Sequence, residues 1–350
     1  GESITGIAYY DNNTRIALAG DFYAFQQNPS VSTNQVGGCT VDGKNCYPLG
    51  SGLPGYIGAG QLVSFRNQLY VIYTTDEGTT VASFDYLNSN SDWKPIYQAS
   101  GVKSNKYWLV VYRDELWMFG NIVDFNNDTK SAAKWIETNS TWVFFDSDLI
   151  MQNTSDIVTA LSPDGQRAYI TSADPIYVWN DTVNNWEIFY TPDCEYTSYI
   201  TALNTGLVVT CGANLTFVDL NANAQLIENY NCPTNIWIAL NSNPNGEVFY
   251  GYCSIAPAVM ETSAYNISSF SVAKSTNISE LAELKVDLRS MCVYGPKIFI
   301  SGLFDEVNEI PAKRHAIWDD RTQQWYKASD TEPTVCYCST DGEMMAAACS

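Results

Sequence analysis

The sequence predicts an all-β protein, a β-propeller of seven four-stranded blades, and three observations carry this prediction. Short apolar runs rich in Val, Ile, Tyr, Phe and Trp recur along the chain, separated by turns of Asn, Asp, Gly and Ser. No amphipathic pattern long enough for a helix of three turns is present. The runs also repeat in groups, at a spacing of roughly 40–50 residues, the length of a four-stranded propeller blade.

Length and composition agree with a large modular β fold. The chain has 350 residues, of which 45% are hydrophobic and 13% aromatic. This composition is ample for a packed core and argues against disorder. Because a chain of this size exceeds the usual single core, a modular fold is expected.

The repeated unit has four strands in a fixed order. It reads as an apolar strand, a tight polar turn, a second apolar strand often ending in Gly, a loop, a short strand with an aromatic residue, a turn, and a final strand opened by Trp. The last copy is the clearest and spans residues 290–294, 297–304, 315–319 and 324–327. The third and fourth copies span residues 108–142 and 157–186, and the first places residues 15–22 before 47–53.

A closing aromatic residue marks the last strand of most copies. These residues are Tyr47, Trp93, Trp142, Trp186 and, two copies later, Trp325. The fifth and sixth copies lack it. Seven units fit between Gly1 and about Thr331.

The C-terminal tail is expected to form one more hairpin within the same domain. We predict a propeller over residues 1–333 and a disulfide-pinned hairpin over residues 334–350, with Asp341-Gly342 as its turn. The hairpin is either a partial eighth blade or a flap that seals the gap between the last and first blades. Because the chain starts with an inner strand, closure by an N-terminal outer strand is not expected. We hypothesise that the hairpin offers an unpaired edge to a neighbouring subunit.

N-glycosylation triplets and cysteines indicate an extracellular protein. Eight Asn-x-Ser/Thr triplets occur, mostly beside turn residues, at Asn12, Asn127, Asn139, Asn153, Asn180, Asn214, Asn266 and Asn277. The ten cysteines form no C-x-x-C pair, and with one histidine a zinc site is disfavoured, so disulfides are expected. Gly1 opens no signal-peptide pattern, which suggests a mature secreted chain, and no apolar stretch reaches the roughly 18 residues of a membrane span.

The cysteine positions predict five disulfides. Three pairs flank predicted hairpins, one pair crosses a short loop, and the last pair follows by elimination and joins neighbouring repeats. In that order the pairs are Cys194–Cys211, Cys232–Cys253, Cys336–Cys349, Cys39–Cys46 and Cys292–Cys338.

Four short motifs relate the repeat to known families. They are Gly20-Asp-Phe22, Gly302-Leu-Phe304, Ala316-Ile-Trp-Asp319 and Leu49-Gly-Ser-Gly-Leu53. The pattern resembles kelch-like extracellular propellers and, more closely, the repeats of fungal and protist cell-surface glycoproteins of the cortical polarity-marker type. This resemblance implies a propeller with a cell-surface or wall role and without a conserved active site.

The charge limits the partners. The net charge is −20, with 38 acidic against 18 basic residues spread along the chain. Repulsion from phosphates disfavours nucleic acid and anionic membrane surfaces as partners. The acidic excess is interpreted as a source of solubility.

Histidine scarcity removes several kinds of catalysis. Copper-radical oxidases are secreted kelch propellers that need two His ligands, whereas this chain has only His315, interpreted as a surface or hydrogen-bonded residue at the start of a strand. Ser-His-Asp and Cys-His machinery is disfavoured for the same reason, and no Gly-x-Ser-x-Gly elbow is present.

Two acidic motifs are candidate catalytic or calcium sites. Ser162-Pro-Asp164-Gly165 faintly resembles a sialidase Asp-box but is interpreted as a hairpin turn. Asp124, Asn126 and Asp128 have the spacing of calcium ligands, but the loop lacks the Gly turn and the distal Glu, so a loop without an ion is preferred. No cofactor is expected.

The sequence therefore predicts a non-catalytic secreted glycoprotein that serves as an extracellular structural, adhesion, coat or filament subunit. Its partners would be copies of itself or other extracellular glycoproteins, with glycans as a further class. The alternative is a lectin or a carboxylate-pair glycosidase that uses the central face of the propeller.

Overall fold

The computed structural model of the chain describes residues 3–12, 14–21, 24–25, 31–40, 45–53, 55–88, 90–100, 107–146, 158–171, 175–193, 197–211, 214–226, 237–242, 248–254, 265–271, 279–284, 288–294, 297–302, 304–312, 315–319, 321–327, 336–338 and 347–349. For the sixth blade and the terminal hairpin, the description covers the backbone. These residues contain no α-helix and one short 3-10 helix, Glu137–Asn139. None of the described helices is long and apolar enough to cross a membrane.

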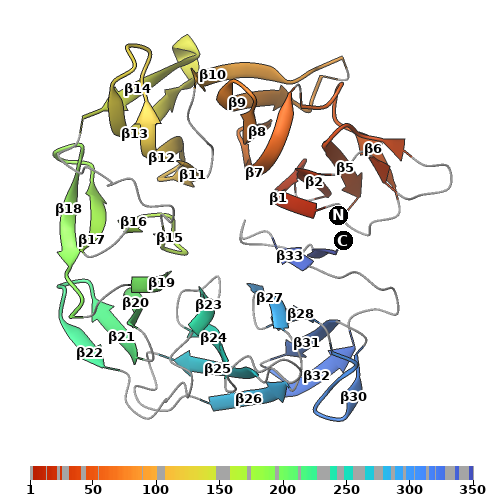
Figure 1. Ribbon diagram of the computed structural model, residues 1–350, viewed down its shortest axis with the longest axis vertical. Helices are drawn as coiled ribbons and strands as arrows, with labels where there is room; N and C mark the ends of the chain where they lie inside the picture. Colours follow the sequence, from red (N-terminus) through yellow and green to blue (C-terminus); the bar gives the residue numbers. More distant parts are fainter. Residues whose placement is uncertain are drawn as a thin grey trace.

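Seven four-stranded antiparallel sheets are arranged in a ring, which confirms the predicted β-propeller (Figure 1). The first three blades are β1 Ser3–Tyr10, β2 Arg15–Asp21, β5 Val36–Thr40 and β6 Cys46–Pro48; β7 Tyr56–Phe65, β8 Gln68–Thr75, β9 Gly78–Asp85 and β10 Lys94–Ser100; and β11 Tyr107–Tyr112, β12 Glu115–Val123, β13 Thr129–Ile136 and β14 Thr141–Phe145. The fourth and fifth are β15 Val158–Leu161, β16 Ala168–Thr171, β17 Ile176–Asn180 and β18 Asn185–Tyr190; and β19 Thr197–Leu203, β20 Gly206–Cys211, β21 Asn214–Asp219 and β22 Ala224–Leu226. The sixth and seventh are β23 Trp237–Ser242, β24 Val248–Ser254, β25 Tyr265–Ser271 and β26 Ser279–Leu284; and β27 Leu288–Tyr294, β28 Lys297–Gly302, β31 His315–Asp319 and β32 Gln324–Lys327.

Three small two-stranded sheets complete the fold. Two lie between the second and third strands of the first and seventh blades, as β3 Ala24–Phe25 with β4 Val31–Ser32 and as β29 Glu306–Val307 with β30 Ile310–Pro311. The third is the predicted terminal hairpin, β33 Cys336–Cys338 and β34 Ala347–Cys349. Its expected turn, Asp341-Gly342, lies outside the described residues.

The terminal hairpin lies in the gap between the last and first blades. The first strand of every blade is innermost in the ring, so β27 and β1 face each other across this gap (Figure 1). β33 contacts both strands, and β34 contacts β1. This position fits both the partial eighth blade and the sealing flap, and the proposed edge for a neighbouring subunit stays a prediction.

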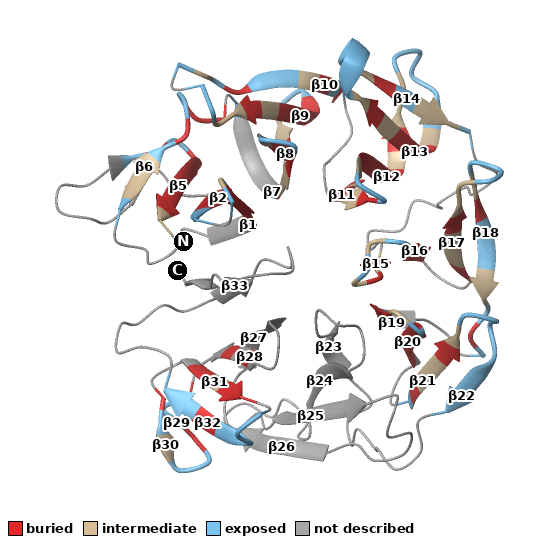
Figure 2. Cartoon of the chain, turned by 180° about the vertical axis from the view of Figure 1, so that it is seen from behind, coloured by how far each residue is buried: buried red, intermediate tan, exposed pale blue. Residues whose placement is uncertain are grey.

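The described core of the first five blades lies between neighbouring sheets, where their apolar faces meet. Figure 2 shows the buried residues concentrated on the sheets and the exposed ones at the turns and outer strands. Full burial of one large apolar side chain stabilises the fold by roughly 1.5–3 kcal/mol, so these faces dominate the stability. Two such clusters join Val36 and Leu49 of the first blade to Leu69, Tyr73 and Trp93 of the second, and Trp117 and Phe119 of the third blade to Ile170, Trp179 and Trp186 of the fourth.

One recurrent cross-strand pair joins the third and fourth strands of a blade. The pairs of the third, fourth and seventh blades are Trp135 with Trp142, Trp179 with Trp186, and Trp318 with Trp325, whose ring centroids lie 5.4, 5.4 and 5.5 Å apart. In the first blade Cys39 and Cys46 occupy this place and form the predicted disulfide, with a sequence separation of 7. A covalent bond there replaces an aromatic contact.

The register corrects one sequence assignment. Tyr47 was assigned as the closing aromatic of the first blade, but it lies opposite Gly38, whereas Cys46 lies opposite Cys39. Successive residues of a strand point to opposite faces, so a shift of one residue changes the face. Tyr47 is therefore not the equivalent of Trp142; Cys46 is.

The other predicted disulfides are only partly covered by the description. The register places Cys336 directly opposite Cys349, as it places Cys39 opposite Cys46, and this is the geometry that a cross-strand disulfide needs. Strands β27 and β33, which carry Cys292 and Cys338, contact each other. Cys194 and Cys232 lie outside the described residues. These four pairs stay predictions.

The turn between the third and fourth strands of one blade reaches back to the preceding blade. Asp92, in the second blade, accepts hydrogen bonds from the Ser51 amide at 2.9 Å and from the Ser51 hydroxyl at 2.8 Å. The Trp93 indole N–H donates to the Leu49 carbonyl at 2.9 Å. The Ser51 and Trp93 donors hold the pKa of Asp92 below its usual range. The Leu49–Leu53 motif is thus a clasp between the first two blades.

In the next two blades, the turn between the third and fourth strands also contacts the preceding blade, here through ion pairs. Arg66 of the second blade lies 3.0 Å from Glu137 of the third, and Arg113 of the third lies 2.6 Å from Asp181 of the fourth. Both arginines occupy the turn between the first two strands, and both acids follow a core Trp by two residues. Such exposed pairs contribute about 0.2–1 kcal/mol each, so they orient the blades more than they stabilise them.

Gly50→Ala is expected to break the clasp, and Gly165→Ala is the matched control. Both glycines have a left-handed φ, +64° and +68°, so both variants carry the strain of a Cβ there, about 1 kcal/mol. At Gly50 the Cβ would also lie 2.5 Å from an Asp92 oxygen, whereas at Gly165 it meets nothing within 4 Å. Urea unfolding should show a loss of about 3 kcal/mol or more for Gly50→Ala. Equal losses would contradict the clasp.

Replacement of both Cys39 and Cys46 by Ala should lower the free energy of unfolding. The loop that the bond closes is short, with a sequence separation of 7, so the loss of chain-entropy stabilisation is about 2 kcal/mol. Urea unfolding followed by Trp fluorescence checks this value. An unchanged urea midpoint would mean that the hydrogen-bonded pairing of β5 and β6 is enough to hold these two strands together.

Candidate functional site

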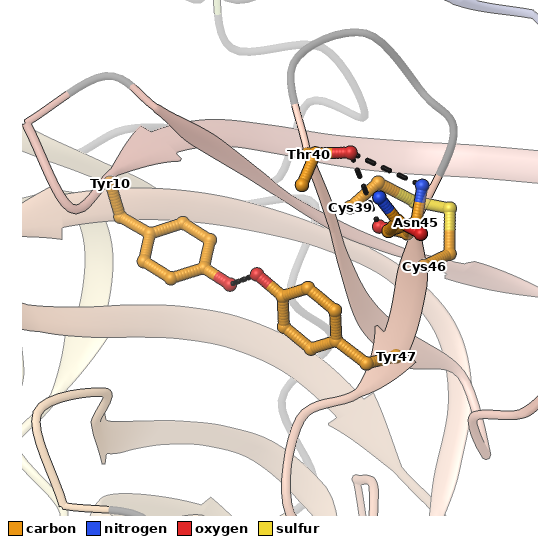
Figure 3. Close-up of a disulfide and its surroundings, with 6 residues drawn as sticks. All are labelled: Tyr10, Cys39, Thr40, Asn45, Cys46 and Tyr47. Carbon is orange, nitrogen blue, oxygen red and sulfur yellow. Dashed lines mark hydrogen bonds between the residues drawn. A yellow bond between two sulfur atoms is a disulfide. The ribbon is translucent and has the colours of Figure 1, made fainter.

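A pair of tyrosines lies near the disulfide of the first blade (Figure 3). The Tyr10 and Tyr47 hydroxyls are 2.5 Å apart and point toward each other (Figure 3). Gly38 makes this approach feasible, because a Cβ there would lie 2.5 Å from the Tyr10 hydroxyl and 2.7 Å from the Tyr47 ring. The Tyr86 ring of the second blade lies 4.9 Å from Tyr10, so the cluster spans two blades.

The electrostatics of this cluster oppose acid–base catalysis by a phenolate. Burial and the hydrogen bond to Tyr47 raise the pKa of Tyr10 far above its ordinary value. The Arg15 guanidinium lies 5.5 Å from the Tyr47 ring centre and 3.3 Å from the Asp11 carboxylate. A catalytic tyrosine needs a lowered pKa. The hydrogen bond between Tyr10 and Tyr47 therefore joins the innermost and outermost strands of the first blade, β1 and β6.

The loop proposed as a weak calcium candidate is held by its own amides and a lysine. One Asp124 oxygen accepts hydrogen bonds from the backbone N–H groups of Asn126 at 2.8 Å and Asp128 at 2.9 Å. The other lies 3.7 Å from Lys130 Nζ, which also pairs with Asp146. These donors hold the pKa of Asp124 below its usual range. Within the described residues no three potential ligands gather as a metal site.

The same local turn recurs at Asp219. Its carboxylate accepts from the backbone amides of Asn221 at 2.8 Å and Asn223 at 2.9 Å, and the Asn223 amide donors lower its pKa. An acidic residue at such a turn closes the chain on itself, which is the ordinary role of Asp in loops. The Asp124 and Asp219 loops therefore share one hydrogen-bonding pattern.

The faint Asp-box is a hairpin turn, as interpreted from the sequence. The Gly165 amide donates to the Ser162 carbonyl at 2.7 Å, and the Ser162 hydroxyl accepts from the Arg167 amide at 2.9 Å. The turn also touches both neighbours: the Arg113 amide donates to the Gly165 carbonyl at 3.1 Å, and the Asp164 amide to the Asn204 side chain at 3.2 Å. Its polar groups serve contacts between blades.

Asp181 is a carboxylate with three donors that sequence reasoning did not single out. It accepts from the Tyr112 hydroxyl at 2.7 Å and the Trp179 indole at 2.9 Å, and Arg113 lies 2.6 Å away. The signal that would have found it is the spacing already described, an acid two residues after a core Trp, with an Arg one blade earlier. These contacts link Tyr112 and Arg113 of the third blade to Asp181 of the fourth.

Five glycosylation acceptors are described at side-chain level, and four are exposed. Asn12 lies in the β1–β2 turn, Asn127 in the β12–β13 turn, Asn139 between β13 and β14, and Asn214 at the start of β21. Asn180, at the end of β17, is half-buried.

The remaining predicted site residues are covered in part. Asn153 and Asn277 lie outside the described residues, and Asn266 lies in β25, of which the backbone alone is described. His315 begins β31, as expected, and its side chain lies outside the description.

Comparison with known proteins supports the fold and nothing finer. No protein-family model matches the chain, and no curated protein matches its sequence. A computationally designed protein, Ika8, is similar in structure, with a TM-score of 0.61 and 9% identity over 98% of this chain and 95% of that one. The WD40 domain of SCAP from fission yeast has a TM-score of 0.49 and 9% identity, over 85% of this chain and 82% of that one. The PQQ-bound aldose sugar dehydrogenase of Streptomyces coelicolor has a TM-score of 0.40 and 9% identity, over 77% of this chain and 95% of that one.

Buried phenols predict a loss of stability at alkaline pH. Burial is the main cause that raises the pKa values of Tyr70, Tyr73 and Tyr169 to about 12. Because an unfolded phenol has a pKa of about 10, the stabilisation is fully present below pH 10 and is lost as the pH rises through 12. Each phenol should contribute a loss of about 1 kcal/mol at pH 11, measured by urea unfolding with tyrosinate absorbance.

Tyr169→Phe provides the variant that tests this loss. Its hydroxyl is buried and has no hydrogen-bond partner among the described residues, so the variant removes a titrating group without breaking a bond. The variant should lose less stability between pH 8 and pH 11 than the wild type. Tyr326→Phe, at a position that is 42% exposed, is the control. Parallel curves for all three proteins would contradict the assignment.

Proposed function

We propose that this chain is a secreted, non-catalytic glycoprotein that serves as a structural, adhesion, coat or filament subunit outside the cell. The observation that carries the proposal is the exposure of four acceptor asparagines, Asn12, Asn127, Asn139 and Asn214, at turns and a strand start of the propeller. Glycans there would extend from the turns without disturbing the sheets. The Cys39–Cys46 disulfide suits the oxidising compartment in which such glycans are added.

Three of the described carboxylates support a non-catalytic role. The pKa values of Asp92, Asp124 and Asp219 all lie below the usual range, because backbone or side-chain N–H and O–H groups donate to each carboxylate. A glycosidase general acid needs the opposite direction, a raised pKa. The described turns thus use their carboxylates to hold the chain together.

Assembly into a polymer or coat is expected for the native protein. Exposed apolar side chains on the outermost strands, Val143 at 41%, Ile188 at 64% and Leu226 at 50%, offer contact area outside the ring. Electron microscopy of the protein released by its native source should show ordered polymers or sheets. Site-specific mass spectrometry should find glycans on Asn12, Asn127, Asn139 and Asn214.

Two other outcomes would redirect the function. Dispersed single propellers that bind a glycan array would favour the lectin, and dispersed propellers that hydrolyse glycosides would favour the carboxylate-pair enzyme. If mass spectrometry finds none of these acceptors occupied, the proposal that the chain is a glycoprotein is wrong. If polymers form, deletion of residues 334–350 tests whether the terminal hairpin contributes the edge, and unchanged association would exclude it.

A further inference from the structure

Phe125 is a large apolar side chain that lies mostly in solvent. It is 65% exposed, in the turn that joins β12 to β13. Large apolar side chains that are this exposed cost hydration free energy, and an isolated one is ordinary. The surroundings of this ring make it more than an isolated case.

The ring is fixed in place by the protein beneath it. Phe125 meets Phe144 of β14 edge to face, with ring centroids 5.2 Å apart and an interplanar angle of 86°. Phe144 in turn lies 6.2 Å from the buried Tyr97. The loop itself is closed by the Asn127 amide, which donates to the Asp124 carbonyl at 3.0 Å. Phe125 is therefore an exposed platform that the Phe144 ring supports on one side.

A glycosylation acceptor follows this platform at a fixed spacing. Asn127 is two residues beyond Phe125, is exposed, and has a left-handed φ of 67°, a conformation that Asn adopts readily. Thr129, two residues further on, completes the triplet and is also exposed. The order is Phe-x-Asn-x-Thr across one tight turn.

We propose that the first sugar of a glycan on Asn127 packs against the exposed ring of Phe125. The C–H groups on one side of a pyranose ring form an apolar, slightly positive surface, and the face of an aromatic ring is negative, so the two attract. The contact removes apolar area of both partners from water. This inference rests on the proposed glycosylation and adds a specific role to one site, the stabilisation of its own loop.

The other acceptors provide a contrast within the chain. Asn12 also follows an aromatic residue by two positions, but Tyr10 is 2% exposed and is engaged by Tyr47 and Tyr86. Asn139 follows Glu137 and Asn180 follows Val178 at the same spacing. Among the acceptors described at side-chain level, Asn127 alone has an exposed aromatic residue at this position.

The test is a double-mutant cycle on protein secreted from a eukaryotic host. Thr129→Val removes the triplet and keeps Asn127 and the strand, Phe125→Ala removes the platform, and the double variant closes the cycle. Hydrogen exchange of the Asn126, Asn127 and Asp128 amides reports on the loop, because these groups carry its hydrogen bonds. Leu87→Ala, at a position 66% exposed and outside any triplet, is the control.

Loss of the glycan should speed this exchange roughly threefold to tenfold when Phe125 is present, and should change it little in the Phe125→Ala background. Enzymatic trimming of the wild-type glycan to one sugar should leave exchange unchanged, because only the first sugar contacts the ring. Leu87→Ala should behave as the wild type.

The two ways to fail are separate. If mass spectrometry finds Asn127 unoccupied, the glycosylation proposed for this site is wrong and the packing with it. If Asn127 is occupied and loss of the glycan has the same effect with and without Phe125, the glycoprotein proposal stands and the packing is wrong.

Discussion

The four-stranded sheets of the first five blades bury apolar side chains on the faces that meet, and the rest of the structure depends on this packing. The core there is a series of layers between successive blades. A blade that covers its faces against its neighbours leaves the two ends of such a series uncovered, and closure into a ring brings the first and last blades together (Figure 1). At the point of closure, β33 contacts both β27 and β1. The hairpin thus covers strands that would otherwise be free at the gap.

The polar contacts between blades then serve alignment. Apolar burial contributes roughly 1.5–3 kcal/mol for each large side chain, whereas an exposed ion pair such as Arg66–Glu137 contributes about 0.2–1 kcal/mol. The ion pairs and turn hydrogen bonds therefore fix how neighbouring sheets are rotated. The Asp92 clasp differs, because a carboxylate with several donors makes stronger, charge-assisted hydrogen bonds. It lies in the Leu49–Leu53 motif, which therefore has a structural role between the first two blades.

The turns between strands are a large part of the exposed surface (Figure 2), and this explains where most of the described glycosylation acceptors lie. Asn adopts the left-handed conformation that tight turns need, as Asn12 with φ 53° and Asn127 with φ 67° show. A turn is also where an Asn side chain reaches solvent. Turn formation and glycosylation therefore select the same residue at the same places. The carboxylates of Asp124 and Asp219, in contrast, accept hydrogen bonds from the backbone of their own turns.

The sequence by itself determined the strands, their grouping and the blade number, because alternation and turn chemistry are local properties. The bounds of β31 and β32 agree with those expected. The tertiary structure decided which face and which partner each residue has. It placed Cys46, not Tyr47, opposite Cys39, and it gave Asp181 an Arg partner one blade earlier. It also buried Tyr10 and exposed Phe125, although both precede an acceptor by two residues. Burial depends on the neighbouring blade, and no local pattern contains that information.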